Sequence, residues 1–133
     1  MGRVFFNTRK NVVDQDGAHT MTAEDSGKTF LVSGGTQAVT LLPAADMIEG
    51  WNCRFITTAS PSGDKVIGAG TTIMHGSSAN GSGDAGAASD GTAKTSVTIE
   101  AASQAGNFVD IVCDGNAYYV SGTHGQNNAT TFA

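Results

Sequence analysis

A cysteine and a histidine near the C-terminus are the first residues whose types could support catalysis. Cys113 could serve as a nucleophile and His124 as its base. Cys113 lies in an apolar run typical of a buried strand, whereas His124 falls in a polar stretch where we expect it to be exposed. A reactive thiol needs an accessible, electropositive setting. The sequence therefore favours a buried structural cysteine over a thiol-base pair.

Other nucleophiles and acids do not fall into a catalytic pattern. Ser78 and Ser82 have glycine neighbours, but no Gly-x-Ser-x-Gly elbow precedes a helical pattern. Two acidic pairs, Glu24 with Asp25 and Asp46 with Glu49, fall on predicted turns. Solvated carboxylates are more common there than the catalytic pair of a glycosidase. Residues 68–70 lack the third glycine and the helix of a phosphate-binding loop. We therefore predict that the chain is not an enzyme and uses no cofactor.

Metal ligands are equally scattered. His19, His75 and His124 are isolated, without the spacing of a zinc site. Asp14-Gln15-Asp16-Gly17 is similar to the start of a calcium loop but lacks the later ligands, and Gly81-Ser82-Gly83-Asp84 occurs only once where a calcium-binding β-roll needs stacked copies. Aspartate beside glycine is the ordinary chemistry of a turn, which is the reading we favour over a metal site.

The composition indicates a single β-rich domain. The chain has 133 residues, of which 39% are hydrophobic and 18 are glycine. Glycine at this level supplies turns with positive φ, so many short strands are expected. Cys53 and Cys113 both lie in apolar runs, which favours buried free thiols over a disulfide.

The charge is divided unevenly along the chain. Three basic residues, Arg3, Arg9 and Lys10, lie in the first ten positions, which contain no acid. The remaining residues hold 4 basic and 12 acidic groups, a formal charge of −8. An acidic body disfavours nucleic acid and anionic membranes as partners, whereas the basic segment would suit an acidic protein surface. The sequence has no apolar run long enough to span a membrane and no signal-peptide pattern, so we expect synthesis in the cytoplasm.

Short alternating runs separated by turn residues predict a small antiparallel β-sandwich or barrel-like domain. Residues 51–58 alternate, with Cys53 and Phe55 on one face and Asn52 and Arg54 on the other. The predicted strands cover residues 29–32, 38–42, 51–58, 65–68, 71–74 and 94–99, with one helical turn within 44–49.

A hairpin is the strongest local prediction. Residues 107–113 and 116–121 flank Asp114-Gly115, a pair suited to a type I′ turn. Tyr118 and Tyr119 should point to opposite faces, so that one of them reaches solvent or a partner.

Around these strands we divide the chain into three parts. Residues 1–18 form an extended docking arm, 19–122 the β-domain, and 123–133 a polar C-terminal tail. Within the domain, residues 76–92 are a loop rich in Gly, Ser and Ala, which is either a mobile surface excursion or a segment draped over a neighbouring subunit.

The order of several phrases resembles small virion proteins of tailed bacteriophages, namely head decoration (cement) proteins, head fibres and fibre-tip domains. The similarity spans residues 20–122, and Tyr119 stands where such hairpins usually have Trp. Its phrases are Thr20–Phe30 with Asp25-Ser26-Gly27-Lys28, Val39-Thr40-Leu41-Leu42-Pro43, Gly50-Trp51, Phe55-Ile56, Ile67, Ile73, Val97-Thr98-Ile99 and Asp114–Gly122.

This resemblance implies a capsid decoration protein, commonly a homotrimer, that binds the major capsid protein on the outside of the phage head and stabilises the shell. The partner contacts are then expected in the arm, which combines basic and apolar side chains and could add to an exposed sheet edge. The residues expected to make these contacts are Arg3, Val4, Phe5, Phe6, Arg9 and Lys10.

Two other functions are compatible with the sequence. A fibre or spike module would bind host-surface glycans through an exposed tyrosine or the loop at 76–92. A small hydrolase would need a site that the sequence does not reveal.

Overall fold

Short strands separated by glycine-containing turns make up nearly all of the structure, a computed structural model that describes residues 11–81, 86–89, 91–126 and 129–133. The elements are β1 (Val12–Gln15), β2 (His19–Thr20), the 3-10 turn η1 (Ala23–Asp25), β3 (Lys28–Val32), β4 (Gln37–Thr40), the 3-10 turn η2 (Ala44–Asp46), β5 (Asn52–Thr57), β6 (Lys65–Gly68), β7 (Met74–Asn80), β8 (Ala87–Ala88), β9 (Ser96–Ile99), β10 (Phe108–Cys113), β11 (Tyr118–His124) and β12 (Thr130–Phe132).

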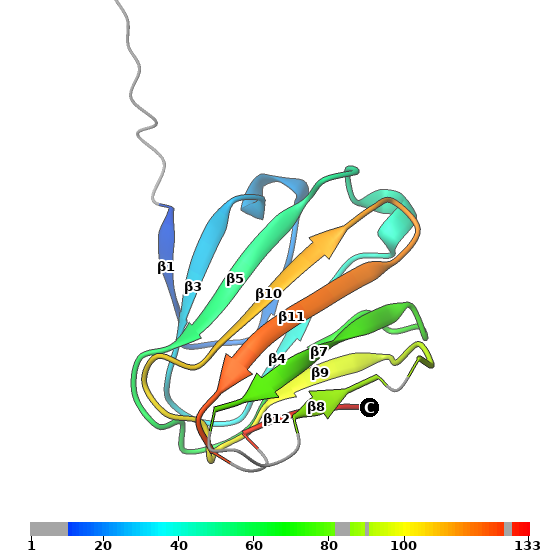
Figure 1. Cartoon of the computed structure of the whole chain (residues 1–133). Helices are drawn as coiled ribbons and strands as arrows, with labels where there is room; N and C mark the ends of the chain where they lie inside the picture. The colour runs from blue at the N-terminus through cyan, green and yellow to red at the C-terminus, as the bar shows by residue number, and fades with distance from the viewer. Residues whose placement is uncertain (1–10, 82–85, 90, 127–128) are drawn as a thin grey trace, which may run out of the picture.

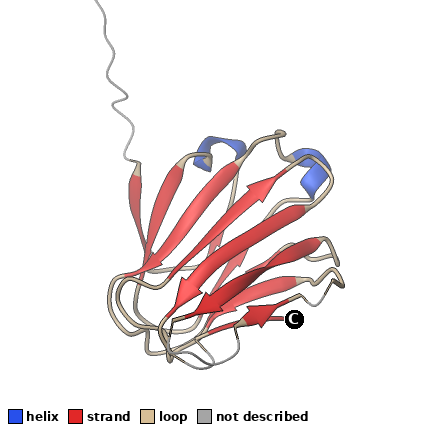
Figure 2. Ribbon diagram, viewed as in Figure 1, coloured by secondary structure: helices blue, strands red, loops and turns tan. Residues whose placement is uncertain are grey.

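The strands form two sheets that pack face to face as a β-sandwich (Figure 1). Sheet A has the order β1-β3-β5-β10-β11-β7-β8, and sheet B has the order β12-β9-β6-β4-β2. Both 3-10 turns lie at the same end of the sandwich (Figure 2). The predicted all-β sandwich is confirmed.

The sheets are mixed rather than purely antiparallel. From β1 to β7 successive strands belong alternately to sheet A and sheet B. Between two successive strands of one sheet, the chain therefore crosses to the other sheet and back. Successive strands of one sheet therefore run the same way: β1, β3 and β5 are parallel, as are β2, β4 and β6. A parallel pair needs a crossover connection, and here the opposite sheet supplies it in place of a helix.

The N-terminal part of the sandwich begins inside the predicted arm. Val12–Gln15 form β1, which pairs with β3 at the edge of sheet A, so only residues before this strand can extend from the domain. The first ten residues lie outside the described part of the chain.

Two further segments are more regular than expected. Strand β7 continues to Asn80 and β8 pairs with it, so the predicted loop at 76–92 begins in one strand of sheet A and contains another. The predicted tail also contributes structure, because β11 continues to His124 and β12 pairs with β9 in sheet B. Extended backbone rich in Gly, Ser, Ala and Thr gives little hydrophobic alternation, which is why the sequence pattern missed these strands.

Large aromatic side chains fill the space between the sheets. Phe30 and Phe55 stack with ring centroids 5.2 Å apart, and Trp51 meets Tyr118 edge to face at 6.3 Å. Their polar atoms are satisfied: Trp51 Nε1 donates to the Thr22 carbonyl at 2.9 Å, and the Tyr118 hydroxyl to a backbone carbonyl. Buried aromatic residues with paired polar tips fix the arrangement of strands in the core.

The predicted β10–β11 hairpin is confirmed, but its turn closes one residue later. The Asp114 N–H donates to the Ala117 carbonyl at 3.2 Å, which places Gly115 and Asn116 at the tip. Gly115 has φ 89°, and the Asp114 carboxylate accepts the N–H groups of both Asn116 and Ala117 at 2.8 Å. The two tyrosines behave as predicted, since Tyr118 is buried and Tyr119 is 48% exposed.

Candidate functional site

The acidic residue of the Asp-Ser-Gly-Lys phrase is a structural anchor. The Asp25 carboxylate accepts hydrogen bonds from Lys28 Nζ at 2.7 Å and from the Thr22 N–H at 2.9 Å, and lies 3.0 Å from His19 Nε2. Burial on its own would raise the pKa of Asp25, but these hydrogen bonds and the Lys28 charge outweigh burial and hold the pKa below its ordinary value. Asp25 therefore ties β2 of sheet B to β3 of sheet A at one end of the sandwich.

His124 is buried rather than exposed. It is 3% exposed in β11, and its Nδ1 lies 2.8 Å from the Ser78 hydroxyl on the neighbouring strand β7. Burial lowers the pKa of His124, which favours the neutral ring. Because Ser78 is only 1% exposed, the contact joins two buried polar groups and leaves the hydroxyl inaccessible to a substrate.

The two cysteines are buried free thiols, as predicted. Cys53 pairs in register with Ile111, two residues before Cys113 on β10, so the thiols are diagonal neighbours on the inner face of sheet A. Burial, with smaller contributions from the charges of Asp25 and Asp110, raises the pKa of Cys53 and keeps it protonated. The Cys113 thiol lies 3.7 Å from the Ala44 carbonyl.

The candidate metal ligands take part in strand and turn structure. Asp14 belongs to β1, and the Gln15 side-chain amide donates to the Gly17 carbonyl within the calcium-like phrase. His75 stacks on Tyr119 with ring centroids 6.0 Å apart. Within the described ranges, no group of three or more His, Cys, Asp or Glu side chains could hold a metal ion.

The predicted partner contacts cannot be placed on the fold. Arg3, Val4, Phe5, Phe6, Arg9 and Lys10 all lie outside the described residues.

The outer face of sheet A carries a line of polar side chains that was not predicted from the sequence. Five residues on neighbouring strands stand in direct register. We name them the polar row: Thr29 (β3), Arg54 (β5), Asp110 (β10), Ser121 (β11) and Ser77 (β7).

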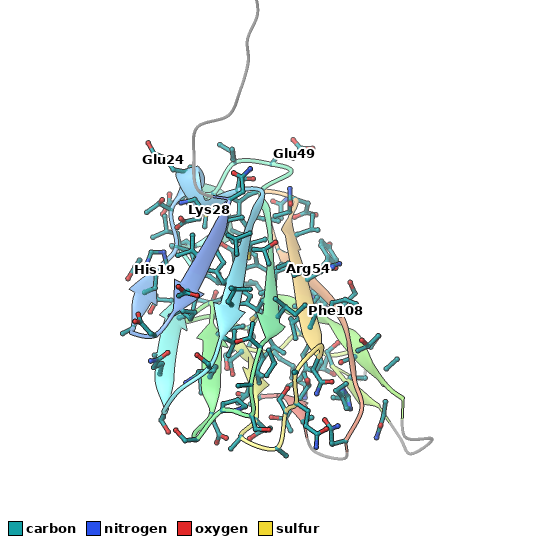
Figure 3. The ribbon with its side chains drawn as sticks, turned by 90° about the vertical axis from the view of Figure 1, so that its left-hand side faces the viewer. His19, Glu24, Lys28, Glu49, Arg54 and Phe108 are labelled. Atoms are coloured by element: carbon teal, nitrogen blue, oxygen red, sulfur yellow. The ribbon has the colours of Figure 1, made fainter. Side chains whose placement is uncertain are left out.

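An ion pair forms the centre of the polar row. Arg54 Nε donates to Asp110 Oδ1 at 2.6 Å, and Arg54 Nη2 donates to Asp110 Oδ2 at 2.7 Å. The guanidinium also lies 4.4 Å from the centroid of the Phe108 ring, and Figure 3 shows Arg54 and Phe108 close together on this face. The hydrogen bond to Asp110 is the main reason that the pKa of Arg54 is raised, so the guanidinium stays charged. Bidentate pairing and stacking hold both side chains in one orientation.

An open groove runs along four residues of the polar row, Thr29, Arg54, Asp110 and Ser121. It has a volume of about 460 Å³ and is lined by Gly27–Thr29, Asn52–Arg54, Asp110–Val112 and Ser121. Beside it runs a less polar row in which Asn52, Val112, Tyr119 and His75 stand in register. Val112 is 44% exposed, so the groove places an apolar margin next to the ion pair.

Part of this face was visible in the sequence. The alternation in residues 51–58 places Asn52 and Arg54 on the outer face, as the structure confirms, and Ile56 is half-buried there. The pairing of Arg54 with Asp110 was not visible, because the two residues are 56 positions apart and meet only through the β5–β10 register.

No described helix is long and apolar enough to cross a membrane. Comparison with known protein families, curated proteins and solved structures finds no match for this chain.

Proposed function

We propose that this chain is a virion structural protein of a tailed bacteriophage, a capsid decoration protein that binds the outside of the head and stabilises the shell through contacts with the major capsid protein. It acts through binding rather than turnover. Many copies, each contributing interface area, would hold neighbouring capsid subunits together.

The observation that carries the proposal is the division of charge between the first ten residues and the sandwich. The first ten residues hold three basic groups and no acid, while the rest of the chain has a formal charge of −8. This basic segment precedes β1, the edge strand of sheet A, in the sequence. A basic, partly apolar segment on an acidic domain suits a partner surface that is acidic and exposes apolar patches.

The resemblance supports the same function. Its phrases recur as the structural elements of one sandwich, from the Asp25 anchor to the β10–β11 hairpin. The proposal includes a homotrimer on the head surface, for which the mass of the full chain in solution is the direct measurement.

A co-sedimentation assay with undecorated capsids tests the role of the arm. Removal of residues 1–10 stops short of Val12, where β1 begins, and should leave a folded domain that no longer saturates capsids. The triple variant Arg3→Glu, Arg9→Glu and Lys10→Glu should bind at least tenfold more weakly, and this loss should depend on ionic strength.

Lys94→Glu is the matched control, because it changes a basic residue of the sandwich and should bind within twofold of the wild type. Unchanged saturation by the truncated chain would disprove the arm's role, and failure of the full chain to bind any capsid would disprove the decoration function.

A further inference from the structure

The polar row crosses five adjacent strands at nearly constant spacing. Neighbouring strands lie about 4.8 Å apart, so the part of the row that lines the groove, from Thr29 to Ser121, is about 14 Å long. Such a length suits an extended ligand lying across the strands better than a small molecule in a closed cavity. The groove along this part of the row is open rather than enclosed.

The row keeps unused hydrogen-bonding capacity at the surface. Arg54 donates two of its five N–H groups to Asp110, so three donors are left. Each Asp110 carboxylate oxygen can accept a further hydrogen bond. The side chains of Arg54 and Asp110 are 45% and 30% exposed. Thr29 and Ser121 place hydroxyls, which can both donate and accept, on either side of the ion pair, so the groove offers both donors and acceptors.

Charge restricts the class of ligand. An anion would be attracted by Arg54 but repelled by Asp110, and a cation would be attracted by Asp110 but repelled by Arg54. Neither charge is favoured, because the two groups lie within 2.7 Å of one another. A purely apolar ligand would remove water from the ion pair without replacing its hydrogen bonds. The groove therefore fits a neutral ligand that carries many hydroxyl groups.

The apolar margin fits the same class. A sugar ring presents hydroxyl groups at its edge and C–H groups on its faces. Val112 and the half-exposed ring of Tyr119, which His75 supports by stacking, offer a surface for such C–H groups beside the polar row. We propose that the outer face of sheet A binds a neutral oligosaccharide, with Arg54 and Asp110 hydrogen-bonded to adjacent hydroxyls.

The residues proposed for this site belong to the described domain, on β3, β5, β10 and β11, and none of them is one of the arm residues proposed to contact the capsid. A decoration protein attached through its arm could therefore present the groove to glycans in the surroundings of the particle, and the two activities can be tested independently.

The test uses the full chain and an array of neutral oligosaccharides of glucose, galactose and N-acetylglucosamine, together with sialylated counterparts. A neutral oligosaccharide that binds on the array is then titrated into 15N-labelled protein. The amide signals of Arg54, Asp110 and Ser121 should shift together, while those of the outer face of sheet B, such as Val66, should stay in place.

Two conservative variants assign the contacts. Asp110→Asn keeps the shape but removes the charge, and Arg54→Met keeps the aliphatic stem; each should weaken binding at least tenfold. Because the ion pair is exposed, neither variant should unfold the domain, which the thermal midpoint checks. Glu24→Gln, at the end of the sandwich shown in Figure 3, should bind within twofold of the wild type.

Three results would overturn the proposal. One is the absence of binding and of amide shifts with every neutral oligosaccharide at millimolar concentration. Another is selective binding of sialylated glycans that needs Arg54 but tolerates Asp110→Asn, which would identify an anion site. The third is neutral-glycan binding that neither variant weakens, because the contacts would then lie elsewhere.

Discussion

Replacing Lys65 with methionine should stabilise the protein. Lys65 belongs to β6, faces the interior together with Ile67, and is 1% exposed. Its ammonium group has no hydrogen-bond partner among the described residues, and neither does the side-chain oxygen of Gln37, which stands opposite it on β4. Burial lowers the pKa of Lys65. The side chain is therefore held where its charge is disfavoured.

The magnitude follows from two costs that methionine avoids. The cost of burying the Lys65 charge is limited by deprotonation: removing a proton at pH 7 from an amine with an ordinary pKa of 10.5 costs about 5 kcal/mol at about 1.4 kcal/mol per pH unit. An unsatisfied buried nitrogen adds about 1–3 kcal/mol. Some of the total is relieved because the flexible stem can shift, so we expect Lys65→Met to gain about 2–4 kcal/mol in the free energy of unfolding at pH 7.

The pH dependence of the free energy of unfolding is an independent test of this explanation. With a lowered pKa in the folded state, Lys65 binds its proton more tightly when the chain is unfolded, so the stability of the wild type rises with pH until about 10.5. Methionine has no such dependence. The advantage of Lys65→Met should therefore shrink as the pH is raised from 7 towards 10.5.

Urea unfolding followed by the fluorescence of Trp51, the only tryptophan in the sequence and fully buried, measures both effects. Lys94→Met is the control, since Lys94 is only half-buried, and should change stability by no more than about 0.5 kcal/mol. A destabilised Lys65→Met variant, or a gain that stays constant from pH 7 to 10, would refute the reasoning.

Two further predictions concern the scaffold. Asp25→Asn should lower the free energy of unfolding by about 1–3 kcal/mol at pH 7 through loss of the Lys28 and His19 contacts. Because the pKa of Asp25 is lowered in the folded state, its contribution disappears as the pH falls through that lowered value, so acid titration of both proteins should close the gap. Gly76→Ala should prevent stable β7–β11 pairing, since a Cβ there would lie 1.9 Å from the Val120 carbonyl oxygen; an unchanged thermal midpoint would contradict this.

The fold class could be predicted because alternation and turn chemistry are local. Residues 51–58 showed their inner and outer faces directly, and Asp114-Gly115 located the hairpin to within one residue. Strand direction could not be predicted in the same way. Whether β3 and β5 are parallel depends on the intervening β4 crossing to the other sheet, and a period of two carries no information about which sheet a strand joins.

The candidate site was less accessible to sequence reasoning for a related reason. The Arg54–Asp110 pair depends on a register between strands that are far apart in the chain. His124 was expected to be exposed because its neighbours are polar, yet pairing of β11 with β7 carries it inward to Ser78. Both features arise from tertiary pairing, which overrides local composition.

The residues of the sequence phrases that resemble phage proteins mainly stabilise the fold. Asp25 and Lys28 join the sheets, Gly27 takes φ 81° in the turn, and Trp51 lies in the core with its nitrogen bound to the Thr22 carbonyl. In this chain these residues stabilise the sandwich.

The outer face of sheet A is under a different constraint, because its side chains are exposed and can change without disturbing the core. Binding specificity is therefore free to vary there and in the residues before β1. A pair such as Arg54–Asp110, which contributes little to stability when exposed, is more readily explained by what it binds than by the fold it belongs to.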